Sequence, residues 1–124
     1  MLLKKQLTPR SVMLTFDDGW LDNYTCAFPL LKKHNIKANI FLTAGLVGQN
    51  NMLAWSQIEE MRQSGLAEFA SHGLTHKRLR ALSDDDCLSE LIQSKKILEQ
   101  KLGRKILSFA YPYGSCDKRV RALV

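Results

Sequence analysis

Two short polar runs, far apart in the chain, carry the residue types of a hydrolytic metal site. Residues 15–20 read Thr-Phe-Asp-Asp-Gly-Trp and contain Asp17 and Asp18. Residues 71–76 read Ser-His-Gly-Leu-Thr-His and contain His72 and His76. Imidazole nitrogens and carboxylate oxygens are common ligands of catalytic zinc, and such sites keep a coordination position open for water or substrate. This set of side chains therefore predicts metal-assisted hydrolysis.

Each run by itself also has an ordinary structural explanation. Asp-Gly is frequent in turns, and two histidines four residues apart lie more often on a surface or at a helix end than on a metal. Adjacent carboxylates repel each other, however, and a cation relieves that repulsion. Two aspartates in different environments can divide the work, one as a metal ligand and the other as a general base. Together the two runs favour a metal centre.

The elements that must position these residues alternate along the chain. Apolar runs predict strands over residues 12–16, 38–43, 66–71 and 106–110. Such alternation with helices predicts an α/β fold with parallel strands and right-handed crossovers. The polar motifs follow the first, third and fourth strands, and the carboxyl ends of parallel strands are where ligands bind in such folds.

Helices are predicted between these strands. The expected segments are residues 22–34, with a restart at Pro29, residues 56–64, with Trp55 or Ser56 as the cap, residues 83–102, with Ser83 as the N-cap, and residues 117–124.

Composition places the chain among ordinary globular domains. It has 124 residues, 45% of them hydrophobic, and a net charge of +6, which fits one domain. The basic residues lie in three separate groups without interleaved aromatics, so we expect a solvated surface and no nucleic-acid partner. No apolar run is long enough for membrane insertion, and residues 1–10 lack the apolar stretch of a signal peptide.

The three cysteines, Cys26, Cys87 and Cys116, include no close pair. Their odd number argues against a disulfide framework and against a cysteine zinc site. Cys26 is expected to pack within its helix.

A third run, Tyr-Pro-Tyr-Gly at residues 111–114, completes a pattern. In type, order and placement after strands, the three runs resemble the first three motifs of the polysaccharide deacetylases, the nodulation-protein-B homology family or carbohydrate esterase family four. The resemblance spans residue 11 to the end of the chain. It implies a partial (β/α) barrel with parallel strands, in which this chain supplies about four βα units of a distorted barrel of about seven strands.

The resemblance also implies an activity and roles for residues. The reaction would remove acetyl groups from an N-acetylated or O-acetylated polysaccharide. Asp17 would be the general base, and Asp18, His72 and His76 would hold a divalent metal, zinc foremost, with cobalt and nickel as alternatives. Tyr113 would supply a backbone N–H to stabilise an oxyanion.

Substrate contacts are expected from the same region. The candidates are Pro112, Tyr113 and Trp20; for Trp20, ordinary packing is the favoured alternative.

Two departures from the family pattern bear on activity. Ala110 stands where the family usually has an arginine that orients the base, and the biofilm poly-N-acetylglucosamine deacetylases are similar in lacking it. The later motifs, including a histidine general acid, would lie beyond Val124, and His34 is a poor substitute. We therefore expect residues 1–124 to form a single incomplete deacetylase domain with an unclosed sheet, which raises the hypothesis of a homodimer that covers it.

Three other interpretations compete with this one. The chain could be an inactive, metal-loaded carbohydrate-binding fragment, or the product of a truncated gene. A receiver-type signalling module also alternates strands and helices and carries an acidic pair. It needs a phosphoacceptor aspartate after the third strand, where this chain has Ser71 and His72, so this interpretation is disfavoured.

Overall fold

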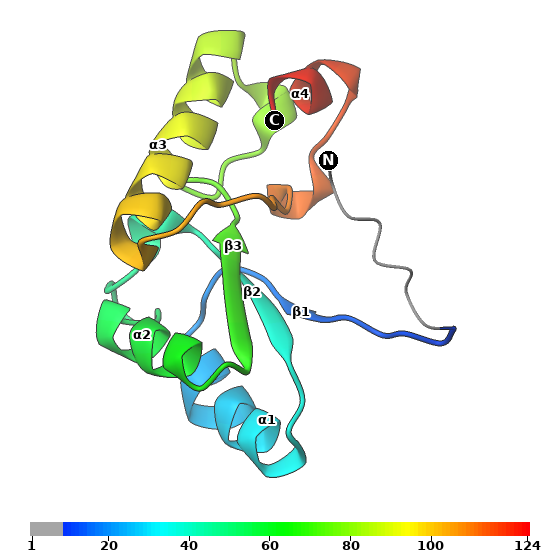
Figure 1. Ribbon diagram of the computed structural model, residues 1–124. Coiled ribbons are helices and arrows are strands. Elements are labelled where there is room, and N and C mark those ends of the chain that lie inside the picture. Colours follow the sequence, from blue (N-terminus) through cyan, green and yellow to red (C-terminus); the bar gives the residue numbers. More distant parts are fainter. Residues whose placement is uncertain (1–8) are drawn as a thin grey trace.

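A three-stranded parallel sheet lies at the centre of the molecule (Figure 1). The computed structural model describes residues 9–124, so most of the segment on which the signal-peptide expectation rests lies outside the described residues. The strand order is β1-β2-β3, and Phe16, Ile40 and Phe69 lie at the same level across the sheet. The strands are β1 (Leu14–Phe16), β2 (Ala38–Leu42) and β3 (Ala67–Ser71).

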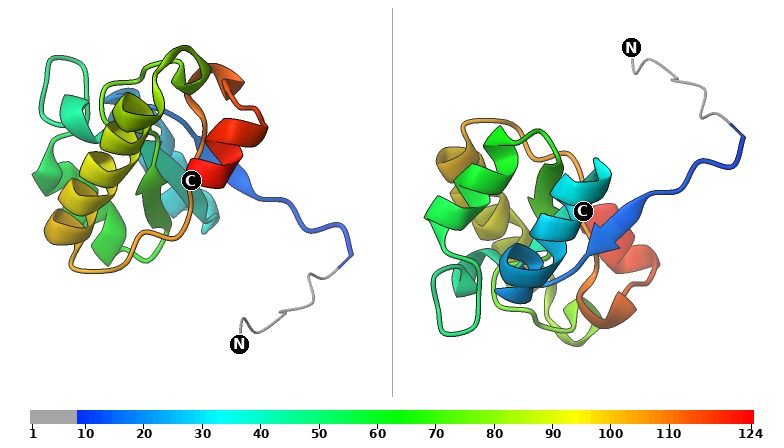
Figure 2. Two further views of the ribbon diagram at one scale, coloured as in Figure 1. Left: turned by 90° about the horizontal axis from the view of Figure 1, so that it is seen from above. Right: turned by 90° about the horizontal axis from the view of Figure 1, so that it is seen from below.

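Helices connect the strands, so the α/β class with parallel strands is confirmed (Figures 1 and 2). None of the helices within residues 9–124 combines the length and apolar character needed to cross a bilayer. The helices are the π-helical segment η1 (Asn23–Ala27), α1 (Phe28–His34), α2 (Trp55–Gln63), α3 (Asp84–Leu102) and α4 (Lys118–Leu123). Within residues 9–124 there are also three short 3₁₀ turns: η2 (Ala44–Leu46), η3 (Leu79–Ala81) and η4 (Pro112–Gly114).

The helix expected over residues 22–34 changes from π type to α type between Ala27 and Phe28. Pro29 stands in the first turn of α1, where its missing N–H costs no helical hydrogen bond. The restart is therefore confirmed and lies one residue before the proline.

The hydrophobic core lies between the sheet and the helices α2 and α3. In β2 the buried side chains alternate with less buried ones, as expected for a strand with one face on the core. Leu102 and Ile106 extend the core toward the end of α3. Six large side chains form its fully buried centre: Ile40, Leu42, Leu53, Ile58, Met61 and Leu98.

Local signals explain why α3 begins and ends where it does. The Ser83 hydroxyl accepts a hydrogen bond from the Asp86 N–H, which confirms Ser83 as the N-cap. Three aspartates occupy the first turn, where the helix dipole favours negative charge. Gly103 ends the helix with φ 64°, a left-handed conformation that glycine adopts without strain.

The fourth expected strand does not form. Residues 106–110 make a single parallel bridge to β3, between Phe109 and Ser71. Ser71 donates its N–H to the Ser108 carbonyl and accepts the Ala110 N–H. The Leu107 side chain is 85% exposed. An apolar run predicts burial on both faces, but within residues 9–124 no strand lies beyond this segment to pair with it.

Other differences are smaller. The first strand is shorter than expected, because pairing begins at Leu14 and leaves Val12 and Met13 exposed. The N-cap of α2 is Ala54 and not Trp55 or Ser56, and the Gln57 side chain accepts the Ala54 N–H. Cys26 is exposed, so the expectation that it packs inside its helix is wrong.

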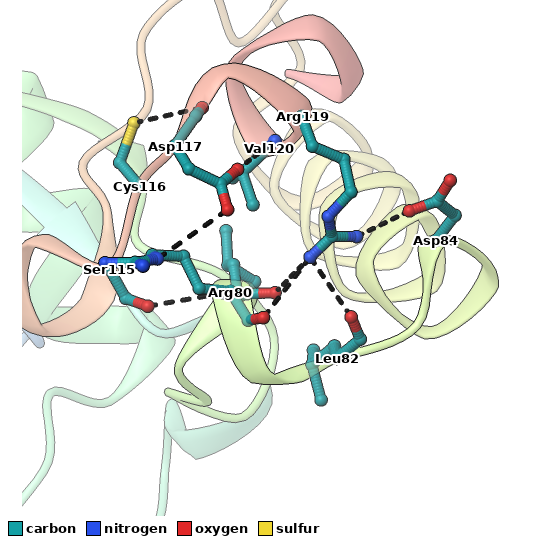
Figure 3. A network of polar contacts seen from close by, with 9 residues as sticks. Arg80, Leu82, Asp84, Ser115, Cys116, Asp117, Arg119 and Val120 are labelled. Carbon is teal, nitrogen blue, oxygen red and sulfur yellow. Dashed lines mark hydrogen bonds and ion pairs between the residues drawn. The ribbon is translucent and has the colours of Figure 1, made fainter.

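The end of the chain is anchored by a network of polar contacts (Figure 3). Arg119 of α4 pairs with Asp84 at the start of α3 and donates to the Leu82 carbonyl. Arg80 pairs with Asp117, the N-cap residue of α4. These contacts tie α4 to the loop that precedes α3.

Candidate metal centre and active site

Asp18, His72 and His76 converge at the carboxyl ends of β1 and β3. One carboxylate oxygen of Asp18, Oδ1, lies 2.9 Å from His76 Nε2 and 3.3 Å from His72 Nε2. One ligand atom from each of the three residues lies within 4.8 Å of the other two. The parallel sheet produces this meeting, because it brings strand ends that are remote in sequence to one edge.

The arrangement fits a divalent cation. Asp18 Oδ1 is buried and has no hydrogen-bond donor among the described residues, a costly state for a carboxylate oxygen unless a positive charge lies nearby. His72 Nδ1 lies 3.0 Å from the Ala110 carbonyl, which favours a hydrogen on Nδ1 and leaves the Nε2 lone pair toward Asp18. Two nitrogens and one oxygen are ligands that zinc accepts.

Burial also favours the neutral imidazole that a metal requires. The pKa of His72 is lowered by desolvation, against the opposing charges of Asp17 and Asp18. The ring is 2% exposed. A neutral ring is the form that offers a lone pair to a cation.

Three site residues have left-handed backbone conformations. Asp18 has φ 71°, His76 φ 60° and Tyr113 φ 58°. Such conformations are uncommon for residues with a side chain, and they gather at functional sites where the surroundings hold them. Gly19, with φ 85°, has no room for a side chain, because an added Cβ would lie 2.7 Å from Leu42 Cδ2.

Trp20 contacts the candidate metal ligand directly. Its indole N–H donates to Asp18 Oδ2 at 2.9 Å, while Oδ1 of the same carboxylate faces the two imidazoles. The side chain is 48% exposed. Trp20 is therefore not a core residue: its indole N–H orients Asp18, and about half of its surface is open to solvent.

The third motif places Tyr113 against His76. The centroids of the two rings lie 4.6 Å apart. The Arg78 guanidinium also lies over the Tyr113 ring, 4.1 Å from its centroid. Tyr113 is 58% exposed. Pro112, in contrast, is fully buried, so its side chain shapes the loop and presents no surface to a sugar in this structure.

Asp17 lies beside the three-residue cluster and not in it. It is exposed, and its charge acts on His72. His34, the remaining histidine, lines a groove between β1 and α1 and is absent from the cluster.

Sequence analysis missed Glu90, a buried carboxylate in α3 that binds the loop between the two histidines. A signal for it exists in the sequence. Glu90 lies among the buried positions Cys87, Leu91 and Ser94 of the helix, and a charged residue on such a face requires polar partners.

Comparison with known proteins agrees with this geometry. The sequence model of the polysaccharide deacetylases matches residues 4–124. The chain is 36% identical over 110 residues to "Putative polysaccharide deacetylase YxkH" of Bacillus subtilis (strain 168), covering 89% of this chain and 39% of that protein. It is 32% identical over 126 residues to the poly-beta-1,6-N-acetyl-D-glucosamine N-deacetylase of Staphylococcus aureus (strain MSSA476), covering 90% of this chain and 43% of that protein.

A solved structure has the same arrangement of elements. The Streptococcus pyogenes deacetylase PplD, in complex with acetate, superposes with a TM-score of 0.89 at 33% identity, covering 94% of this chain and 52% of that one. The fold and the candidate site thus define an α/β deacetylase-like domain. The chain belongs to the polysaccharide deacetylase family, and it spans about two fifths of the length of the curated relatives it matches.

Proposed function

We propose that this chain carries the metal centre and base of a metal-dependent carbohydrate deacetylase, with acetylated polysaccharide as the substrate class. One observation carries the proposal: the buried Asp18 Oδ1 faces the Nε2 atoms of His72 and His76 and has no hydrogen-bond donor in the part of the chain that the structure describes. Family membership supports the deacetylase class. N-linked acetyl groups on glucosamine are the preferred substrate, because the Staphylococcus aureus relative is named for that reaction.

Asp18, His72 and His76 would hold the cation, with zinc preferred for this donor set and cobalt or nickel as alternatives. A divalent cation bound there would lower the pKa of a water molecule and polarise the acetyl carbonyl. Trp20 and the Ala110 carbonyl keep the Asp18 and His72 side chains in place.

Asp17 would act as the general base. It is exposed, follows β1 beside the cluster, and is not one of the three candidate metal ligands. Its carboxylate is therefore available to accept a proton from the attacking water. The Tyr113 N–H would donate to the oxyanion that forms from the acetyl carbonyl. The exposed faces of Tyr113 and Trp20 would contact the sugar.

We further propose that residues 1–124 are the N-terminal part of a deacetylase domain. The chain covers 52% of PplD. Within the described residues, no strand pairs with the outer edge of β1, and the segment 106–110 is joined to the sheet by a single bridge to β3. In a solution of this chain alone, a second copy would cover the apolar groove between β1 and α1.

Zinc titration in a calorimeter tests the metal centre, and acetate release from a chitin-type or β-1,6-linked glucosamine oligomer tests the reaction. We expect zinc binding that is lost in His76→Ala and retained in His34→Ala, a matched control because His34 lies in the groove. Turnover by this chain alone should be weak, since within residues 9–124 no further histidine joins the cluster to serve as a general acid.

The two readouts separate the candidate functions. Zinc binding without acetate release would favour the inactive carbohydrate-binding interpretation. A wild-type protein that binds no zinc would contradict the metal centre, whatever its turnover.

A further inference from the structure

We propose that Glu90 of α3 is a positioning residue for the candidate metal centre. Its buried carboxylate holds the loop between His72 and His76 in the conformation that aims His76 at Asp18. This inference rests on the proposed function, because the residue acts through the metal-binding loop and touches neither substrate nor the reacting atoms.

The carboxylate is almost completely withdrawn from water, yet each oxygen has a protein donor. Glu90 is 5% exposed. Its Oε2 accepts the N–H groups of Leu74, at 3.0 Å, and Thr75, at 2.9 Å. Its Oε1 accepts a short hydrogen bond from the Thr75 hydroxyl. Hydrogen bonds to an ionised acceptor are stronger than neutral ones, so these three contacts hold the loop firmly.

The bonded residues are those that lead into His76. Leu74 and Thr75 precede it directly, and His76 itself has φ 60°, a conformation that a residue with a side chain adopts only when its surroundings enforce it. The Glu90 contacts fix two of the peptide groups on the N-terminal side of this strained residue. Without them the backbone could relax and carry the imidazole away from Asp18.

A second contact from α3 holds the other end of the loop. The Ser94 hydroxyl, one helical turn after Glu90, lies 2.9 Å from the Ser71 hydroxyl. Ser71 Oγ in turn accepts the Gly73 N–H. The helix therefore contacts the loop on both sides of His72, through Ser94 before it and through Glu90 after it. Of these two helix residues, Glu90 carries the charge.

A carboxylate with these contacts could serve stability alone, so the test must separate positioning from folding. Glu99, also on α3, supplies the matched control, since its carboxylate accepts the Ile106 N–H at 2.9 Å and it is not part of the cluster. Removing either carboxylate deletes a side-chain contact to the backbone. Only Glu90 contacts the histidine loop.

Zinc affinity by calorimetry and thermal stability without metal should be measured for Glu90→Ala, Glu90→Gln, Thr75→Val, Glu99→Ala and the wild type. We expect Glu90→Ala to weaken zinc binding by about 10- to 100-fold, the range typical of residues that orient metal ligands. Glu90→Gln should restore most of the affinity, because an amide oxygen can accept both N–H groups while its NH₂ group faces the Thr75 hydroxyl. Thr75→Val should cause a smaller loss.

Glu99→Ala should keep the wild-type zinc affinity even where its melting temperature falls. Amide hydrogen exchange gives a second readout: the Leu74 and Thr75 amides should lose protection in Glu90→Ala and keep it in Glu99→Ala. If Glu90→Ala does not fold, Thr75→Val provides the comparison with a smaller expected loss, because it removes the hydroxyl that donates to Glu90 Oε1.

Wild-type zinc affinity in Glu90→Ala, or an equal loss in Glu99→Ala, would overturn the positioning role and leave the proposed function standing. Absence of zinc binding by the wild type would overturn both. The two failures are thus distinguishable in one series of titrations.

Discussion

The carboxyl end of β1 and the outer side of the same strand differ in how their side chains are covered. Near the carboxyl end, the buried His72 contacts Asp18 and the Ala110 carbonyl, which come from other parts of the chain. Along the outer side of β1, a groove of about 430 Å³ between this strand and α1 is lined mainly by apolar side chains. Leu14 and Leu30, which line it, are 39% and 57% exposed.

This difference distinguishes the candidate metal centre, whose contacts lie within residues 9–124, from the groove, whose apolar surface is open. The candidate metal centre draws its contacts from β1, β3, α3 and the third motif, all within residues 9–124. The groove follows an unpaired strand edge, and in Figure 2 the chain leading into β1 extends away from the other elements. Exposed apolar surfaces of this kind mark interaction sites, and the proposed second copy would cover this one.

The largest effect should come from removing a metal ligand. Asp18→Ala takes away the carboxylate between the two imidazoles. Zinc binding should therefore weaken by more than about 100-fold, the upper end of the loss caused by removing a residue that only orients a ligand. Asp22→Ala, in the groove lining, is the control and should bind as the wild type does. Calorimetric titration measures both. Equal affinities in the two variants would contradict the assignment of Asp18.

Zinc should stabilise the folded chain through the same residues. A ligand that binds only the folded state adds about 2.7 kcal/mol at a concentration 100 times its dissociation constant, which should raise the melting temperature by several degrees in a scan with and without zinc. The shift should vanish in Asp18→Ala and reverse with a chelator. A shift that survives in Asp18→Ala would place the zinc elsewhere.

Loss of the Trp20 contact should have an intermediate effect. Trp20→Phe keeps an aromatic ring but removes the N–H that holds Asp18 Oδ2, and we expect zinc affinity to fall by about 10-fold, as for one hydrogen bond to a charged group. Trp55→Phe serves as the control, since Trp55 packs against the core. Titration of both variants measures the difference, and unchanged affinity in Trp20→Phe would restrict this residue to contacts with the sugar.

The smallest effect should appear in the groove. If a second copy covers it, Cys26, which is exposed and lines the groove, should be alkylated more slowly as protein concentration rises. Leu30→Lys should weaken the association and restore fast alkylation, with zinc affinity unchanged. Cys87 is an internal reference, because it is buried and its thiol pKa is raised by desolvation, so it should react only on unfolding.

A groove that stays open would give a different result. Alkylation of Cys26 at a rate independent of protein concentration, together with a monomer in gel filtration, would show that no second copy covers β1. The candidate metal centre would not be affected by that outcome.

Much of this molecule follows from the order of residues along the chain. The parallel α/β class, the cap at Ser83, the restart beside Pro29 and the candidate ligands Asp18, His72 and His76 all depend on local patterns, in which a residue and its near neighbours supply the physical cause. The family resemblance added the expected roles, because its motifs are also short and local.

Tertiary structure decided the rest. The segment 106–110 has the composition of a strand, yet it makes one bridge, because a strand requires neighbours that its own sequence cannot specify. The spacing of Glu90 places it on the apolar face of its helix, but only folding decides that Leu74 and Thr75 are its partners. Trp20 could have packed or contacted a sugar, and its bond to Asp18 depends on a turn whose geometry is fixed by Gly19 against Leu42. Contacts between remote segments exist only once the chain is folded, so their partners cannot be read from local sequence patterns.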